Sequence, residues 1–415
     1  MPIAVTYYRL GASSSKVKQK SSPDTKNYGG HTLAANDLAA KYRSQFTVFE
    51  HVTYLNSCSQ GALANSVKQS FAEYLSTLEL QGSAWGDWTA AQEKVRGLTA
   101  RFFNVPSTEM AITTSASAGV SSVASALTFN EGRNKVVTTD NEFPTIGQIW
   151  HAQESRGAKV VHVPTNADLT VNVEAMVKAI DEETMIVSIT HVCFRNGTVT
   201  ELAPIIEAAH RVGALVLVDS YQAVGAIPMD LAELKADFVV GGMLKYLIGV
   251  PGLGFLYARE ETTKHLVPVN TGWFAARDIF KMDIHAYDPA TDARRFESGT
   301  PPIPSLYPAA AGLELVLEIG MQNIAEYVAP LHNELRAGIE AMGGKVVTPA
   351  AAHLHGAMLA VASTDENAHV AALEGEKVIT SCRDGNIRIS PHFYNNRQDV
   401  ERTLAAFQKH KSFLR

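Results

Sequence analysis

The sequence predicts an α/β protein: a large domain built on a mostly parallel sheet of seven strands, followed by a smaller α+β domain. Between residues 110 and 258, short segments rich in Val, Ile and Leu alternate with helical segments, which is typical of a parallel sheet covered on both faces. Beyond Pro301 the pattern changes to longer amphipathic helices. A chain of 415 residues is also too long for one compact core.

Each expected strand is short, apolar and bounded by Gly, Pro, Asn or Asp. The seven strands are expected at Met110–Thr114, Lys135–Thr139, Lys159–Val163, Met185–Thr190, Leu215–Asp219, Phe238–Gly241 and Gly254–Ala258. Apolar residues at helical spacing predict helices at Val173–Ile180, Ala203–Val212, Ala309–Ile319, Gln322–Ala337 and Gln398–Lys409. A strand-like segment, Arg383–Ser390, precedes the last helix.

The first fifty residues differ in texture from the rest of the chain. Residues 1–50 are expected to form an extension that packs with the small domain, residues 51–295 the large domain, and residues 296–415 the small domain. Within the extension, His31–Phe46 carries apolar residues at helical spacing and predicts one amphipathic helix. The segment before Asp24 is basic and rich in serine, so an organellar transit peptide stays open beside a cytoplasmic location.

Composition narrows the functional class. Hydrophobic residues make up 46% and charged residues 19% of the chain, and the net charge is −6, which argues against a nucleic-acid-binding protein. No apolar stretch reaches the ~20 residues that span a bilayer. The three cysteines have neither disulfide nor metal-site spacing, so no metal is expected. An odd and sparse set of cysteines also favours a reducing cytoplasm.

An acid and a lysine are expected on neighbouring strands. One strand ends at Asp219, the next leads to Lys245, and the glycine-rich turn Gly249–Gly254 follows. Ligands of parallel sheets gather outside the carboxyl ends of the strands, so both side chains would face one crevice. A lysine there can form a Schiff base with an aldehyde cofactor, and an aspartate favours the protonated form of a pyridine ring. Taken alone, the two residues are better explained as a surface lysine and a strand-end aspartate that caps a helix, and only the combined segment favours the cofactor.

Residues 213–257 as a whole resemble the class V aminotransferase family of fold-type I enzymes dependent on pyridoxal 5′-phosphate (PLP). This family includes kynureninases, isopenicillin N epimerase and cysteine desulfurases. Its pattern of Asp, two residues, Gln or His, and then a Lys before a Gly-Pro-rich turn matches Asp219, Gln222 and Lys245. The resemblance runs from about Tyr54 to Ala406. It implies Asp219 on the ring nitrogen, Gln222 near the ring hydroxyl, and Lys245 as Schiff-base lysine and catalytic proton shuttle.

Further motifs extend the resemblance to the rest of the cofactor. Residues 113–119 match the phosphate cradle, which implies Ala116 and Ser117 as ligands, with Ser115 nearby; a plain N-cap cluster is the alternative. Phe143, in the segment Asn-Glu-Phe-Pro-Thr, is expected to stack on the ring unless it is a core residue. Thr300 is implied to reach the phosphate of the neighbouring subunit in a homodimer with shared sites, although an interdomain turn would use the same residues.

The resemblance also implies a substrate anchor. Arg388 would bind the α-carboxylate of an amino-acid substrate through its planar fork, whereas a salt-bridged strand arginine is the alternative. Phe194 stands where cysteine desulfurases keep an asparagine and is closer to the kynureninase pattern. The roles of Arg195, as a contact to an acidic substrate group or a structural residue, and of Trp273 stay open.

Two departures from the family pattern are evident. Relatives often carry a serine and a histidine or tyrosine just before the lysine, whereas Gly242, Met243 and Leu244 stand there in this chain, which puts one phosphate contact in doubt. The cysteine desulfurase nucleophile lies in a separate loop, but Cys382 here runs almost directly into the Arg388 segment. Cys382 is therefore expected to be a small buried residue rather than a persulfide carrier.

The predicted function is that of a PLP-dependent enzyme that removes the Cα proton of an amino acid. Phe143 and Phe194 favour cleavage at Cβ, as in a kynureninase-like lyase or hydrolase. Transamination and epimerisation remain alternatives, because the pocket rather than the cofactor chooses among them. A non-catalytic scaffold is the alternative of another class, and the joint presence of Lys245, Asp219 and Arg388 argues against it.

Overall fold

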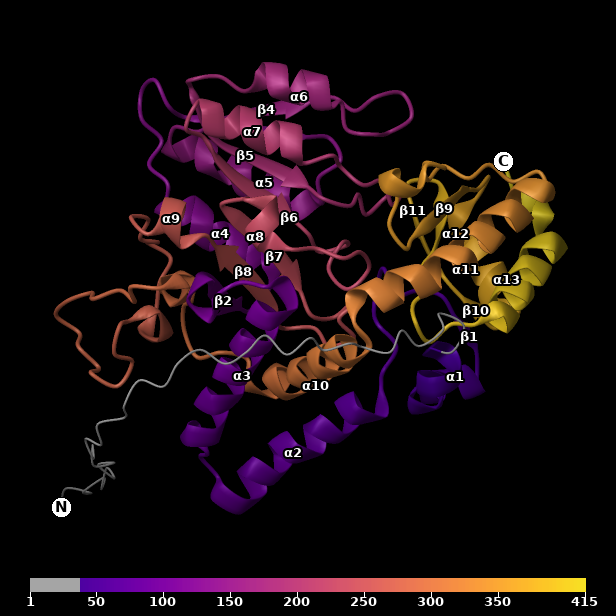
Figure 1. Ribbon diagram of the computed structural model, residues 1–415, viewed down its shortest axis with the longest axis horizontal. Helices are drawn as coiled ribbons and strands as arrows, with labels where there is room; N and C mark the ends of the chain where they lie inside the picture. Colours follow the sequence, from indigo (N-terminus) through magenta and orange to yellow (C-terminus); the bar gives the residue numbers. More distant parts are fainter. Residues whose placement is uncertain (1–37) are drawn as a thin grey trace, which may run out of the picture. The chain divides into compact units, whose positions relative to one another are not determined.

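The computed structural model describes residues 38–415 (Figure 1). Its main sheet has seven strands in the order β2-β8-β7-β6-β5-β3-β4. The strands are β2 (Met110–Thr113), β3 (Lys135–Thr139), β4 (Lys159–Val163), β5 (Thr184–Thr190), β6 (Leu215–Asp219), β7 (Phe238–Gly242) and β8 (Gly254–Ala258). The β8 strand pairs antiparallel with β2 and β7, and the other pairings in this sheet are parallel. The predicted mostly parallel seven-stranded sheet is confirmed.

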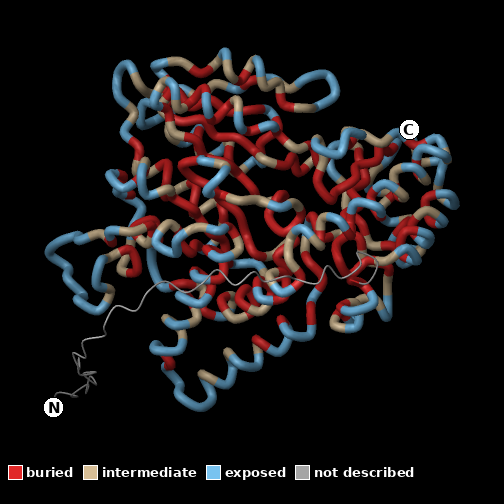
Figure 2. The backbone as a smooth tube through the Cα atoms, viewed as in Figure 1, coloured by how far each residue is buried: buried red, intermediate tan, exposed pale blue. Residues whose placement is uncertain are grey.

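Both faces of this sheet are covered. Consecutive residues of one strand belong to different hydrophobic clusters. Val136 of β3 and Ile186 of β5 belong to one cluster, while the residues that follow them, Val137 and Val187, belong to the other. Successive side chains of a strand point to opposite faces, so an apolar residue at every position requires a layer on each side. Figure 2 shows the buried backbone concentrated along these strands. The helices of this part are α2 (Asn65–Gln81), α3 (Trp85–Phe103), α4 (Ala116–Ala126), α5 (Pro144–Ala152), α6 (Val173–Ala179), α7 (Ala203–Arg211), α8 (Leu231–Leu234) and α9 (Glu260–Thr263).

The C-terminal part combines long helices with small sheets. A three-stranded antiparallel sheet has the order β11-β12-β9, and a parallel pair joins β1 to β10. The strands are β1 (Thr53–Tyr54), β9 (Leu359–Ala362), β10 (Val378–Ile379), β11 (Ser381–Arg383) and β12 (Asn386–Ile389). The helices are α10 (Ile303–Ile319), α11 (Met321–Ala341), α12 (Glu366–Gly375) and α13 (Arg397–Lys409).

Several expected elements differ from the structure, and helix α11 continues to Ala341 rather than ending at Ala337. Helix α10 begins at Ile303 rather than Ala309, because Pro304 occupies the first turn, where no intrahelical N–H is needed. The strand-like segment Arg383–Ser390 is not one strand, because it contains the end of β11, a turn and β12. Asp384 and Gly385 adopt left-handed backbone conformations, with φ of 51° and 77°, and reverse the chain between β11 and β12.

The described part of the extension contacts the C-terminal part of the chain. It comprises α1 (Leu38–Tyr42) and two short 3₁₀ turns that end at Glu50. Arg43 donates to both carboxylate oxygens of Asp399, at 2.6 and 2.9 Å. The segment for which a transit peptide stays open and the first part of the predicted extension helix lie outside the described residues. The division of the chain at residues 50 and 295 stays a prediction.

Two features are absent from residues 38–415. No helix there combines the length and the apolar character needed to cross a bilayer. No group of three or more His, Cys, Asp or Glu side chains in this range is arranged to hold a metal ion.

Candidate active site

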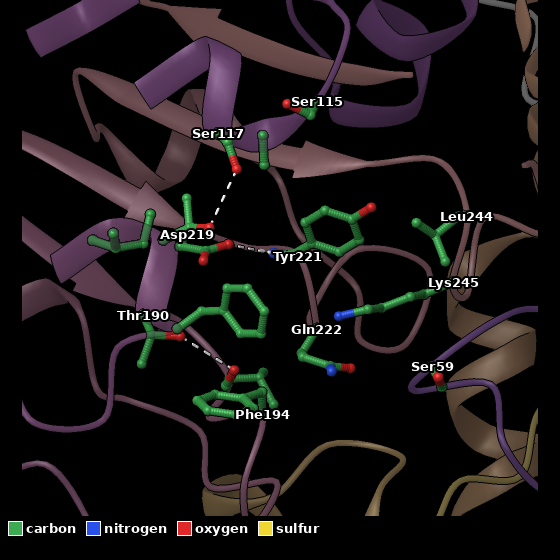
Figure 3. A pocket seen from close by; sticks show the side chains of 15 residues that line it. Ser59, Ser115, Ser117, Thr190, Phe194, Asp219, Tyr221, Gln222, Leu244 and Lys245 are labelled. Carbon is green, nitrogen blue, oxygen red and sulfur yellow. Dashed lines mark hydrogen bonds between the residues drawn. The ribbon is translucent and has the colours of Figure 1, made fainter. Parts of the chain in front are cut away.

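A cavity of about 300 Å³ opens where several parallel strands of the main sheet end (Figure 3). The loops that follow parallel strands meet at this edge, where α/β sheets bind their ligands. The cavity is lined by Ser59, Ser115, Ala116, Ser117, Phe143, Thr145, Ile146, Thr190, Val192, Phe194, Asp219, Tyr221, Gln222, Leu244 and Lys245. Six of the eight sequence-predicted site residues are in this set, and Thr300 and Arg388 are not.

Asp219 is the last residue of β6 and is buried beside Thr190, its partner at the end of β5. Its Oδ1 accepts a hydrogen bond of 2.9 Å from the backbone N–H of Tyr221. Burial raises the pKa of Asp219, while this N–H and the charge of Lys245 act in the opposite direction. A buried carboxylate with so little compensation favours a cationic ligand group beside it.

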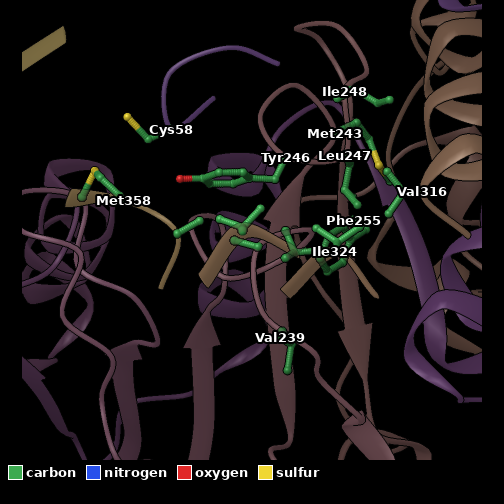
Figure 4. Packing of buried hydrophobic residues seen from close by; sticks show 14 of the residues in the cluster. Cys58, Val239, Met243, Tyr246, Leu247, Ile248, Phe255, Val316, Ile324 and Met358 are labelled. Carbon is green, nitrogen blue, oxygen red and sulfur yellow. The ribbon is translucent and has the colours of Figure 1, made fainter. Parts of the chain in front are cut away.

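Backbone contacts hold the turn that carries Lys245. The Gly61 N–H donates to the carbonyl of Leu244 at 2.8 Å, and the Ile248 N–H donates to the carbonyl of Lys245 at 3.0 Å. A Cβ on Gly61 would overlap the Lys245 carbonyl, so the two segments can approach this closely only because residue 61 is glycine. Residues 246–248 are buried in the main hydrophobic core (Figure 4). Lys245 therefore projects into the cavity from a fixed support.

The amine of Lys245 lies above an aromatic face. Its Nζ is 4.3 Å from the centroid of the Tyr221 ring, within the range of a cation–π contact. Burial lowers the pKa of Lys245 to about 8 and outweighs the opposing charges of Cys58 and Asp219. Part of the amine population is thus neutral near neutral pH, the form that acts as a nucleophile or a base.

Gln222 presents an acceptor without a donor. Its Nε2 donates to the backbone carbonyl of Cys58 at 3.0 Å. Its Oε1 is buried and has no hydrogen-bond partner within the described part of the chain. An unsatisfied buried acceptor costs about 1–3 kcal/mol, so a ligand hydroxyl at this point would offset the loss. The ring hydroxyl of a cofactor could donate a hydrogen bond to this free acceptor oxygen.

The N-terminus of α4 offers donors to an anion. Ser115 caps the helix, and its side chain accepts from the Ala118 N–H at 3.1 Å. The first backbone N–H groups of a helix lack partners within it, and the helix dipole favours negative charge there. Ala116 and Ser117 both line the cavity at this end. The arrangement fits the phosphate of a cofactor whose ring lies near Asp219.

Phe143 is not an ordinary core phenylalanine, since 44% of its surface is exposed. It precedes α5, where Pro144 occupies the first turn. Its ring meets that of Phe194 edge to face, with centroids 5.0 Å apart and planes at 78°. Both rings line the cavity, and an exposed aromatic face there can stack on a flat ligand for about 0.5–1.5 kcal/mol beyond burial.

Arg388 lies behind the cavity wall rather than in it. It is buried, at 5% exposure, on β12. Its guanidinium donates at 3.0 Å to the backbone carbonyl of Phe194 and at 3.0 Å to the Ser381 hydroxyl. Its Nε has no partner in the described part of the chain. The alternative of a salt-bridged strand arginine is not supported, because both of these partners are neutral.

The cavity lining does not include Arg195, Trp273 or Thr300. The sequence left the roles of the first two open and placed Thr300 in the neighbouring subunit's site. Arg195 forms an ion pair of 3.1 Å with Asp384 on the β11–β12 turn. Thr300 is exposed, and its hydroxyl accepts a hydrogen bond of 3.3 Å from the Trp273 indole. Within one chain, none of the three side chains reaches the cavity.

The expectation that Cys382 is a buried residue is wrong. Cys382 is partly exposed on β11, an edge strand of the three-stranded sheet, and its thiol lies 3.6 Å from the side-chain oxygen of Asn367. The hairpin turn, Asp384 and Gly385, begins two residues later. The residue is not among those that line the cavity.

Sequence reasoning missed two residues at this site. Glu142 is buried and accepts hydrogen bonds from the Thr190 N–H at 2.8 Å and the Thr139 hydroxyl at 3.0 Å. Burial and then the charge of Asp219 raise the pKa of Glu142 well above its usual range. Tyr221 was overlooked although it lies between Asp219 and Gln222. Its position inside that motif was the signal that could have identified it.

The sequence of the chain matches a known protein family and two curated relatives. The family model described as aminotransferase class-V matches residues 62–403. The chain is 33% identical over 367 residues to the uncharacterized aminotransferase YcbU of Bacillus subtilis, covering 88% of this chain and 96% of that protein. It is 28% identical over 347 residues to a kynureninase of Burkholderia mallei, covering 78% of this chain and 80% of that enzyme.

Solved structures share the fold. The apo cysteine desulfurase of Thermococcus onnurineus superposes with a TM-score of 0.81 at 22% identity, covering 89% of this chain and 97% of that one. The cystine C-S lyase C-DES, in complex with cysteine persulfide, gives a TM-score of 0.80 at 22% identity, covering 88% and 99% of the two chains. At this level of identity the similarity concerns the fold alone.

The lowered pKa of Lys245 predicts the pH dependence of its reaction with an aldehyde. Only the neutral amine attacks a carbonyl, so the rate should rise about tenfold per pH unit below about pH 8 and level off above it. The measurement is the initial rate at which the protein without cofactor combines with pyridoxal, trapped with borohydride and assigned to Lys245 by peptide mass. In Asp219→Asn the plateau should begin at lower pH, because the anion that raises the pKa is gone. A midpoint near that of free lysine would contradict the assignment.

Proposed function

The chain belongs to the aminotransferase class-V family of PLP-dependent enzymes, and from that premise we propose that it removes the Cα proton of an amino acid and cleaves a bond at Cβ. The observation that supports this most directly is the meeting of Lys245, Asp219 and Gln222 in one cavity. Their chemistry differs: a partly neutral amine, a buried anion and an unsatisfied acceptor. A structural scaffold would gain nothing from maintaining all three.

The residues around the cavity fit PLP. When bound, PLP supplies an electron sink for the charge that is left on Cα. Asp219 would hold the ring nitrogen in its cationic form, since the pair relieves the cost of burying the carboxylate. Gln222 would meet the ring hydroxyl with its free oxygen. Ala116 and Ser117 would hold the phosphate at the N-terminus of α4.

Lys245 is proposed to carry the catalytic proton. Its amine titrates near neutral pH, so it can accept the Cα proton in one step and deliver it to another atom in the next. The Tyr221 ring, 4.3 Å from Nζ, keeps the amine on one side of the cavity. Phe143 would stack on the ring of the cofactor, because it is exposed within the cavity.

The preference for cleavage at Cβ is supported by the aromatic pair at the cavity. Phe143 and Phe194 form an apolar surface that can hold an aromatic or apolar leaving portion of the substrate. The similarity to the kynureninase of Burkholderia mallei points the same way. Transamination is the second candidate, favoured by the higher identity to a protein named an aminotransferase, and epimerisation remains a third alternative.

We expect the purified protein to be yellow and borohydride to attach a phosphopyridoxyl group to Lys245. Lys245→Ala should abolish turnover and leave the fold intact, because the amine performs both the attachment and the proton transfer. Lys264→Ala, which removes an exposed lysine, is the matched control. An amino-acid panel followed for alanine, pyruvate, sulfide and keto acids separates Cβ cleavage from transamination. A protein that stays colourless with added PLP would refute the proposal.

Arg388 is proposed to anchor the substrate α-carboxylate, because its guanidinium is buried next to the Phe194 carbonyl and its Nε lacks a partner. Arg388→Ala should raise the KM of the preferred substrate at least about tenfold, since a charge-assisted fork is lost. Arg388→Lys should recover little, because a single ammonium cannot form the fork. Arg383→Ala removes an exposed arginine from the same hairpin and serves as the control. An unchanged KM would mean that the substrate anchors elsewhere.

We propose that the enzyme acts as a cytoplasmic homodimer with shared sites. Exposed hydrophobic side chains on residues 267–287 support a partner surface near Thr300: Val267, Val269, Phe280, Met282, Ile284 and Tyr287. Because the Thr300 hydroxyl lies outside its own cavity, it is available to the phosphate of the other subunit. The three cysteines, all unpaired, support a reducing compartment.

Light scattering of the purified protein should therefore give twice the chain mass. Thr300→Val should weaken PLP retention without changing that mass, because it removes one hydroxyl donor and keeps the shape. Thr262→Val, at a partly exposed threonine outside the cavity lining, is the control. The shared site would be rejected if the wild type scatters as a monomer, or if Thr300→Val retains PLP as well as the wild type does.

A further inference from the structure

Tyr221 occupies the space in which a side chain at residue 242 would lie. Gly242 ends β7, three residues before Lys245, and a Cβ built on it would overlap the hydroxyl and the ring of Tyr221. Residue 242 is also where the sequence departs from relatives that carry a serine before the lysine. The phenol and a side chain at 242 are therefore mutually exclusive in this fold.

The Tyr221 hydroxyl lies close to the phosphate end of the cavity. Gly242 pairs with Gly254 across β7 and β8, and paired residues of antiparallel strands have Cα atoms about 4.5–5.5 Å apart. A Cβ on Gly254 would lie 2.6 Å from the carbonyl carbon of Ser115 and 2.8 Å from the nitrogen of Ala116. Because these two glycines are paired, the Tyr221 hydroxyl, next to Gly242, lies near the start of α4, next to Gly254. Figure 3 shows the Tyr221 side chain between Ser115 and Ser117 on one side and Lys245 on the other.

The hydroxyl is available as a donor. The backbone N–H of Tyr221 is bonded to Asp219, but the phenol has no hydrogen-bond partner within the described residues and lines the cavity. Burial raises the pKa of Tyr221, so the phenol keeps its proton at neutral pH. A protonated phenol beside an anion site donates a charge-assisted hydrogen bond.

We infer that the Tyr221 hydroxyl donates a hydrogen bond to the phosphate of the cofactor and replaces the hydroxyl that Gly242 cannot carry. The inference rests on the proposed function, since it assumes PLP in this cavity. The ring of the same residue supports the Lys245 amine. One side chain thus contacts both the anionic end of the cofactor and the lysine that attaches it.

Tyr221→Phe isolates the hydroxyl, because the ring under Lys245 is retained. We expect its dissociation constant for PLP, measured by absorbance titration of the protein without cofactor, to rise about tenfold. Its affinity for pyridoxal, which lacks the phosphate, should be unchanged. Tyr307→Phe, on α10 and outside this cavity, is the matched control and should bind both aldehydes as the wild type does.

A second pair of variants tests the exchange of the two positions. Tyr221→Ala should lose PLP affinity, and adding Gly242→Ser to it should recover most of that loss by supplying a hydroxyl from β7. Equal weakening of PLP and pyridoxal binding by Tyr221→Phe, or no weakening of either, would overturn the inference. Absence of PLP binding by the wild type would instead overturn the proposed function. The two failures are therefore distinguishable.

Discussion

A negative charge that is shielded from water needs a cation beside it. The chain gives the buried carboxylate of Asp219 very little compensating positive charge. The nearby amine of Lys245 is itself driven toward its neutral form by burial, and Glu142 adds a second acid whose pKa burial and the Asp219 charge raise well above its usual range. In the proposed function, the cavity would hold one negative charge and receive a ring cation against it. The placement of the amine, the orphaned acceptor and the aromatic surfaces has chemical meaning only with that ring present.

Close backbone approach is what brings these groups into one space. Gly61 lets the segment that follows β1 touch the carbonyl of Lys245, while Gly242 and Gly254 let a tyrosine and the start of α4 share the end of the sheet. These positions are far apart in the sequence, so each glycine is explained by a neighbour rather than by its own backbone angles. The same crowding makes the lysine turn rigid, which suits a residue that must present one amine in one direction.

The C-terminal part of the chain contributes to the site from behind. Through Arg388, β12 contacts the carbonyl of Phe194, a residue of the cavity wall, and through Asp384 the hairpin pairs with Arg195. A substrate carboxylate that competes for the guanidinium would therefore act on both parts of the molecule at once. Such coupling gives the wall at Phe194, rather than the cofactor, the means to distinguish one substrate side chain from another.

Much of this could be predicted from the sequence. The seven strands of the main sheet were expected within one or two residues, because an apolar run and the residues that end it are local signals. Parallel strands leave their carboxyl ends at one edge, so the meeting of Asp219 and Lys245 followed from the strand pattern. Ala116, Ser117, Phe143 and Gln222 came from resemblance to a family, and the structure places all four at the same cavity.

Tertiary structure alone decided the remainder. The start of α10, the hairpin at Asp384, the exposure of Cys382 and the enclosure of Arg388 behind Phe194 each depend on which neighbour packs against the segment. Tyr221 lies in the turn that follows β6, whereas Gly242 ends β7, and nothing in either local sequence says that one fills the space of the other. Local patterns determine where a strand begins and ends, whereas the steric exclusion between two side chains exists only once the strands are side by side.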